Sequence, residues 1–107
     1  MSECLPFDPG CRRCLRLVGH LERVRQRFPA YHSGPVPAFG PYDARLLVVG
    51  LAPGLHGANA SGRPFTGDQA GVLLYRGLHR FGFSDRAESR AVGDGLQLRD
   101  CRITMIY

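Results

Sequence analysis

Apolar residues recur every three to four positions in two segments of the chain, which is the spacing of an amphipathic helix. The first segment predicts a helix over roughly residues 12–28, ended by Pro29. The second predicts a helix that begins after Asp68, placed as its N-cap, and ends just before Gly82. The repeating residues are Cys14, Leu17, Val18, Leu21, Val24 and Phe28 in the first segment, and Ala70, Leu73, Leu74, Leu78 and Phe81 in the second.

Two segments rich in apolar residues lie outside these helices. Residues 44–51 read Ala-Arg-Leu-Leu-Val-Val-Gly-Leu, which predicts a parallel strand covered on both faces. Residues 101–107 read Cys-Arg-Ile-Thr-Met-Ile-Tyr and predict a second buried strand. With the second helix as the crossover, the strands form a βαβ unit of an α/β fold. One crossover helix cannot cover both faces of a sheet, so we expect residues 1–107 to be the N-terminal part of a single domain whose C-terminal part is absent.

The remaining segments have weaker patterns. Residues 29–43 are rich in proline and glycine, and we expect an ordered connector there because four aromatic residues can anchor it. These are Phe28, Tyr31, Phe39 and Tyr42. Residues 83–98 are weakly patterned and predict no definite element.

The composition is that of a globular protein, with 44% hydrophobic and 21% charged residues. No apolar run approaches the about 20 residues that span a bilayer, and the N-terminus lacks the regions of a signal peptide. We therefore expect a cytoplasmic protein with no membrane association. The net charge of +5 permits a polyanionic partner, and all 14 basic residues are Arg. A coding sequence rich in G and C also explains the absence of Lys, so the charge does not identify a partner.

Four cysteines lie at positions 4, 11, 14 and 101. In a cytoplasmic chain they are expected to be metal ligands or free thiols rather than disulfides. The two-residue gap between Cys11 and Cys14 lets both thiolates face one metal or cluster. The same spacing occurs in redox motifs, but those follow a strand, and no strand-like segment precedes Cys11.

The loop over residues 50–68 carries the clearest chemical signal. It reads Gly-Leu-Ala-Pro-Gly-Leu-His-Gly-Ala-Asn-Ala-Ser-Gly-Arg-Pro-Phe-Thr-Gly-Asp. It matches neither the dinucleotide-binding pattern G-x-G-x-x-G nor a phosphate-binding G-K-[ST] loop. It does lie at the carboxyl end of a predicted strand and leads into a helix, which is where open α/β sheets bind ligands. Free backbone N–H groups in such a loop favour anions or carbonyl oxygens.

Residues 50–59, 62–68 and 73–75 resemble the signature of the family 5 (type b) uracil-DNA glycosylases, which are iron–sulfur enzymes. Residues 11–18, 35–40, 95–98 and 102–104 extend the likeness to roughly residues 11–104. The resemblance implies a parallel βαβ sandwich of the uracil-DNA glycosylase type, preceded by an N-terminal helix. It also implies a DNA repair enzyme that flips a deaminated base, such as uracil, out of double-stranded DNA and hydrolyses its N-glycosidic bond. We expect a monomer.

The resemblance also assigns roles within the loop. Phe65 is the aromatic face on which the base stacks; the alternative is a core phenylalanine behind a turn. Asp68 is the candidate catalytic carboxylate; the alternative is the helix N-cap, and both roles can coexist. For His56, the alternative to base binding is a hydrogen bond that stabilises the loop. The remaining base-binding positions are Ala52, Gly54, His56 and Asn59.

The family resemblance further implies a [4Fe–4S] cluster bound by four cysteine thiolates. Cys11 and Cys14 match the first two ligands, whereas Cys4 and Cys101 match none. The chain departs from the family pattern because it lacks the third and fourth ligands and a His-Pro-Ser segment, and because residues 105–107 replace an expected Asn-Ala continuation. Two alternatives to an active glycosylase are therefore an inactive truncated one and a small metal- or nucleic-acid-binding module.

Overall fold

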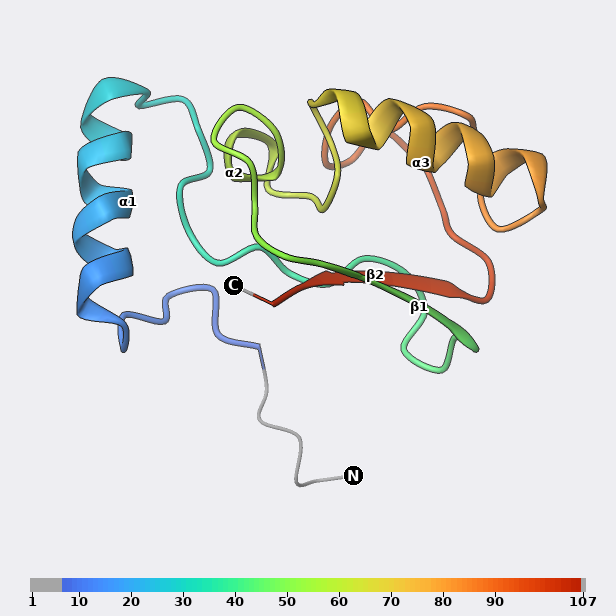
Figure 1. Cartoon of the computed structure of the whole chain (residues 1–107), viewed down its shortest axis with the longest axis horizontal. Coiled ribbons are helices and arrows are strands. Elements are labelled where there is room, and N and C mark those ends of the chain that lie inside the picture. The colour runs from blue at the N-terminus through green and yellow to red at the C-terminus, as the bar shows by residue number, and fades with distance from the viewer. Residues whose placement is uncertain (1–6, 107) are drawn as a thin grey trace.

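The structure is a computed structural model that describes residues 7–106. Within this range the elements are α1 (Leu15–Arg27), β1 (Leu46–Gly50), α2 (Ala58–Ser61), α3 (Gln69–Arg80) and β2 (Cys101–Met105). β1 and β2 pair in parallel, with Val48 opposite Ile103, so the crossover between them carries α2 and α3 (Figure 1). The predicted α/β class and βαβ unit are confirmed. None of the helices in the described range is long and apolar enough to cross a membrane.

The N-terminal helix α1 is shorter than predicted at its start. It begins at Leu15, after Cys14, an N-cap residue in an extended conformation that makes no side-chain capping hydrogen bond, and it ends before Phe28 and Pro29 as expected. Its apolar face is partly covered: among the described residues Val24 is buried, and Leu17, Val18 and Leu21 are half-buried. Figure 1 shows α1 standing apart from the sheet.

The two strands are covered unequally. In β2, Cys101 and Ile103 are both 0% exposed, as a buried strand requires. In β1, Leu47 and Val49 are 56% and 52% exposed. These two residues share a face because side chains alternate along a strand, while α3 lies over the other face (Figure 1). The prediction that β1 is covered on both faces is therefore wrong for the described residues, which place a helix on one face only.

The connector over residues 29–43 makes ordered contacts at three of the four predicted aromatic anchors, whereas Tyr42 is 77% exposed. The rings of Phe28 and Tyr31 stack with centroids 4.7 Å apart. Phe39 forms an antiparallel bridge with Ile103: the Phe39 N–H donates to the Ile103 carbonyl (2.8 Å), and the Ile103 N–H donates to the Phe39 carbonyl (2.7 Å). The bridge covers the edge of β2 that β1 leaves free, which is one reason why β2 is buried and β1 is not.

The hydrophobic core lies between α3 and the sheet and draws on the weakly patterned segment 83–98. Leu96 and Leu98 are 4% and 7% exposed there. An isolated bridge between Ser84 and Leu98 folds this segment back on itself, which turns leucines two positions apart inward together. The core cluster consists of Tyr75, Leu78, Leu96, Leu98, Cys101 and Ile103.

Candidate active site

The loop between β1 and α3 folds around the carbonyl oxygen of Gly54. This oxygen accepts hydrogen bonds from the backbone N–H groups of Gly57 (3.1 Å) and Asn59 (3.0 Å). The Asn59 side chain is turned into the loop: the residue is 5% exposed, and its Nδ2 donates to the Leu55 carbonyl (3.3 Å) and to Ser33 Oγ (3.5 Å). The amide of Asn59 therefore stabilises the loop, and its role in base binding stays a prediction.

Asp68 joins the loop to the start of α3. It is the N-cap of α3, as predicted: its Oδ1 accepts a hydrogen bond from the backbone N–H of Gly71 (3.0 Å). Its Oδ2 lies against the glycine turn, where a Cβ at Gly57 would collide with it and a Cβ at Gly54 would lie 3.4 Å from it. One carboxylate oxygen thus caps the helix while the other lies over the loop, so the capping and catalytic interpretations of Asp68 are compatible.

Phe65 has a backbone φ of +53°, in the left-handed region. For a residue other than glycine, such a conformation costs on the order of 1–3 kcal/mol and is typical of functional sites. Its ring lies at the carboxyl ends of the strands, since a Cβ at Gly50 would come 3.0 Å from the ring and 2.5 Å from Met105 Sδ. The ring packs against the core cluster, and Phe65 also lines a cavity beside Asp68. The core and stacking interpretations of Phe65 are therefore compatible as well.

Two cavities border the loop and divide the predicted site residues between them. A cavity of about 560 Å³ lies between α3 and residues 87–90, and both Phe65 and Asp68 line it. A cavity of about 750 Å³ lies between the loop and α1, and Ala52 and Asn59 line it. Gly54 lies close to Asp68 and so belongs with Phe65 and Asp68. The described residues thus bring Phe65, Asp68 and Gly54 together, but they do not form one base pocket with the others.

His56 is held by the aromatic residues of the connector. Its Nδ1 is hydrogen-bonded to the Tyr31 hydroxyl (2.8 Å). Its ring meets the rings of Phe28 and Tyr31 edge to face, with centroids 5.3 Å and 5.7 Å away. The structural hydrogen bond expected as the alternative for His56 is therefore present. Contact between the His56 backbone and a base stays a prediction.

Behind the Phe65 turn lies a buried ion pair that the sequence motifs do not reveal. The Arg63 side chain is 7% exposed, and its Nη1 donates to Asp94 Oδ1 (3.0 Å) and to Ser89 Oγ (3.0 Å). Its guanidinium carbon also lies 4.4 Å from the centroid of the Phe39 ring. Arg63 thus links three segments: the loop, the connector and residues 89–94.

The Asp94 carboxylate is held ionised by this arrangement. Its partial burial disfavours the charged form, but hydrogen bonds from the backbone N–H groups of Arg90 and Leu96 and from Arg63 outweigh that effect. As a result, the pKa of Asp94 lies well below its usual range. The only hints of this pair in the sequence are an arginine directly before Pro-Phe and an aspartate between two glycines. Because they lie 31 residues apart, no local pattern relates them.

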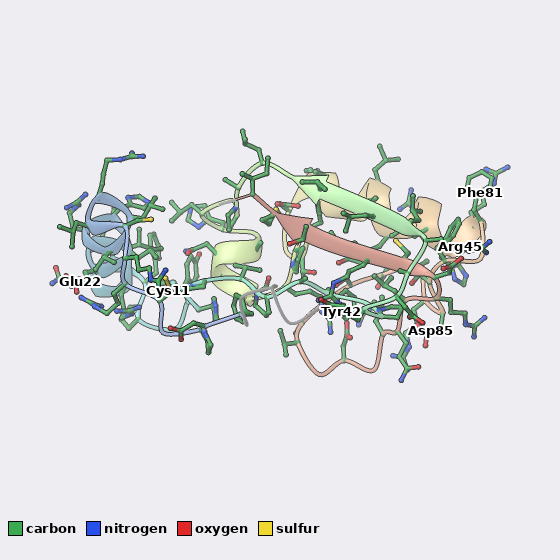
Figure 2. The ribbon with its side chains drawn as sticks, turned by 90° about the horizontal axis from the view of Figure 1, so that it is seen from below. Cys11, Glu22, Tyr42, Arg45, Phe81 and Asp85 are labelled. Carbon is green, nitrogen blue, oxygen red and sulfur yellow. The ribbon has the colours of Figure 1, made fainter. Side chains whose placement is uncertain are left out.

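The cysteines differ in exposure. Cys11 and Cys14 are both exposed and line the larger cavity. Figure 2 places Cys11 near α1, at the opposite end of the molecule from Arg45 and Phe81. Cys101 is buried in the core, and this burial raises the pKa of its thiol, so it is unsuited to metal binding.

Within residues 7–106, no group of three or more His, Cys, Asp or Glu side chains is placed to hold a metal ion. Cys4 lies outside the described residues. Of the four thiolates that the family resemblance implies, the described chain therefore contains two, those of Cys11 and Cys14. The role of these two residues as cluster ligands stays a prediction.

Comparisons with known proteins bear on the whole chain. The family model of the uracil DNA glycosylase superfamily matches residues 37–107. The chain is 48% identical over 100 residues to the type-5 uracil-DNA glycosylase of Thermus thermophilus, an alignment that covers 89% of this chain and 45% of that protein. It is 48% identical over 100 residues to the type-5 enzyme of Mycobacterium leprae (88% and 44% covered) and 41% identical over 99 residues to that of Pyrobaculum aerophilum (89% and 44% covered). The chain thus spans less than half the length of these curated relatives.

Proposed function

Because the chain belongs to the uracil DNA glycosylase superfamily, we propose that it acts as a type-5 uracil-DNA glycosylase on double-stranded DNA that contains uracil or another deaminated base. The observation that carries this proposal is the pairing of Phe65 with Asp68 at the carboxyl end of β1. There, a strained aromatic residue and a carboxylate border one cavity beside a glycine turn. Open α/β sheets bind their ligands at this end of the strands.

Base recognition would depend on the Phe65 ring and on the loop backbone. A base reached inside a duplex must first be extruded, which costs a few kcal/mol, and a pocket recovers part of this through stacking and edge hydrogen bonds. Phe65 is half-buried and backed by the core, so its ring would be a rigid stacking surface. The backbone N–H of Gly54, which lies beside Asp68, would contact a base carbonyl or the charge that develops on the leaving base, whereas Ala52 borders the other cavity.

The chemical step would depend on Asp68. In hydrolysis, a water oxygen bonds to the sugar C1′ and loses a proton while the C1′–N bond breaks; the bonding electron pair leaves with the base, which takes up a proton in turn. The sugar passes through an oxocarbenium-like state, so a nearby anion stabilises it. Asp68 Oδ1 is occupied by the Gly71 N–H, whereas Oδ2 lies over the glycine turn. Oδ2 is therefore the atom that would orient the water or face the cationic sugar.

Cys11 and Cys14 would hold part of an iron–sulfur cluster. Both thiols are exposed on the larger cavity, between the segment before α1 and the loop. When bound, a cluster would serve as a covalent tie in the fold. In this chain, the two thiolates would fix the segment before α1 against the loop, and the remaining ligands would come from outside the described residues.

A metal- or nucleic-acid-binding module is the second candidate. The observation that favours it is the exposed Cys11 and Cys14 pair on a cavity of about 750 Å³, which is separate from the cavity beside Phe65 and Asp68. A protein of this kind would bind metal or DNA without releasing any base. An inactive glycosylase would behave in the same way toward DNA, so base release separates the proposed function from both alternatives.

The proposed function is tested by abasic-site formation on an end-labelled duplex with a single uracil, with the protein in excess. We expect alkali-labile strand breaks at the uracil with wild-type protein. Asp68→Asn should lower the rate at least about a hundredfold, because it removes the charge while keeping a capping side chain. Asp43→Asn, which neutralises an exposed carboxylate in the connector, is the matched control and should keep the wild-type rate. Equal rates in all three proteins would contradict the role of Asp68.

A further inference from the structure

The turn that carries Phe65 is held on both sides by anchored carbonyl groups. The Pro64 carbonyl accepts hydrogen bonds from the Tyr75 hydroxyl (2.7 Å) and from Thr66 Oγ1 (3.2 Å). On the other side of Phe65, the Thr66 carbonyl accepts a hydrogen bond from Ser61 Oγ (2.8 Å). Pro64, Thr66 and Tyr75 are fully buried. Because a left-handed phenylalanine persists only where its surroundings enforce it, these bonds account for the Phe65 conformation.

The hydroxyl groups behind this turn form a chain of hydrogen bonds in which each group donates to the next. Arg63 can only donate, so Ser89 Oγ accepts from Arg63 Nη1 (3.0 Å). The proton of Ser89 is then available for Thr66 Oγ1, which lies 2.6 Å away. Thr66 in turn donates to the Pro64 carbonyl. The chain thus connects the Arg63 guanidinium to the residue that precedes Phe65.

Asp94 fixes the start of this chain. Its Oδ1 accepts from Arg63 Nη1 and from the Leu96 N–H, both at 3.0 Å, and its Oδ2 accepts from the Arg90 N–H (2.9 Å). These bonds close residues 90–96 around the carboxylate, and Ser89 immediately precedes them. The position of the Ser89 hydroxyl therefore depends on the same carboxylate that holds Arg63.

We propose that Ser89 and Asp94 are positioning residues that, through Arg63 and Thr66, hold the Phe65 ring at the site. The inference rests on the proposed function for the identity of the reaction, but its structural part does not. Ser89 also lines the cavity beside Phe65 and Asp68, whereas Asp94 does not, and the role proposed for both is exerted through Phe65. Their effect would be to keep Phe65 and the neighbouring Asp68 in one geometry. A misplacement of about 1 Å at such a site can slow a reaction roughly a hundredfold.

The first test reads the Phe65 ring directly and needs no activity. The protein is labelled with 4-fluorophenylalanine, and the resonance of Phe65 among the six phenylalanines is assigned with Phe65→Leu. Ser89→Ala and Thr66→Val should each shift or broaden the Phe65 resonance. Ser84→Ala is the matched control, since Ser84 is a buried serine of the same segment whose Oγ donates to the Arg86 carbonyl instead. It should leave the Phe65 resonance in place.

The second test measures excision of uracil under single-turnover conditions together with duplex binding. Ser89→Ala and Thr66→Val should each lower the excision rate by about tenfold or more, with duplex affinity within about twofold of wild type. The double variant should be no slower than the slower single variant, because both remove the same link. Ser84→Ala should keep the wild-type rate even if it lowers thermal stability.

An unchanged Phe65 resonance in Ser89→Ala and Thr66→Val would overturn the proposal. So would additive rate losses, or equal losses in Ser84→Ala. If wild-type protein releases no uracil, the proposed glycosylase function fails, and the fluorine signal alone then decides whether the network positions Phe65.

Discussion

Replacing Asp68 with alanine removes the oxygen that caps α3, and the structure allows the loss to be estimated. Oδ1 accepts a single hydrogen bond from the Gly71 N–H (3.0 Å), and losing such an N-cap costs about 1 kcal/mol. In a domain of this size, about 1 kcal/mol lowers the melting temperature by roughly 4–8 °C. Asparagine caps helices about as well as aspartate does, so Asp68→Asn should cost only a few tenths of a kcal/mol.

The assay compares thermal unfolding of wild type, Asp68→Ala and Asp68→Asn by circular dichroism, with urea titrations as a second measure. The expected order of stability is wild type, then Asp68→Asn close behind, then Asp68→Ala. If Asp68→Asn is as unstable as Asp68→Ala, the charge over the glycine turn stabilises the fold, and the capping estimate is refuted. If the expected order is observed, Asp68→Asn keeps the helix cap while removing the charge, so any loss of activity in this variant reports on the charge alone.

Three further results are expected. Gly57→Ala should destabilise the protein by about 1–3 kcal/mol in urea unfolding, because the added Cβ would collide with the Asp68 carboxylate. Gly77→Ala, in α3, is the control: its Cβ would enter open space, so this variant should be more stable than wild type. The depressed pKa of Asp94 means that its contribution to stability is present above its unfolded pKa of about 4 and is lost as the pH falls below that value. Asp94→Asn should therefore lose less stability than wild type between pH 7 and pH 3, and equal losses would refute this. Cys11→Ser should lower the iron content and visible absorbance of anaerobically purified protein; colourless wild-type protein would contradict the cluster proposal.

The features predicted correctly from the sequence are those set by local patterns. The apolar run in residues 44–51 and the repeat after Asp68 predict β1 and α3 because the spacing of apolar residues and the capping residue are features of the segment itself. Asp68 is the N-cap for the same reason. The family motif locates Phe65 and Asp68 together, and the structure places both on one cavity.

The features that the sequence does not predict depend on contacts between distant segments. The exposure of Leu47 and Val49 follows from which elements cover β1, and an apolar run does not carry that information. Leu96 becomes part of the core through the fold of residues 83–98, which lacks a clear period. The pair of Arg63 and Asp94 is a contact across 31 residues and becomes visible only once the loop and the later segment are packed together.

The most direct test of the proposed function is the quantification of free uracil released from a uracil-containing duplex incubated with an equal amount of the wild-type chain. Mass spectrometry distinguishes the released base from nucleotides that a contaminating nuclease would produce, and Asp68→Asn purified in parallel controls for a contaminating glycosylase. The account predicts uracil release by wild type and a rate at least about a hundredfold lower for Asp68→Asn. Duplex binding without uracil release, or equal release by both proteins, would contradict it.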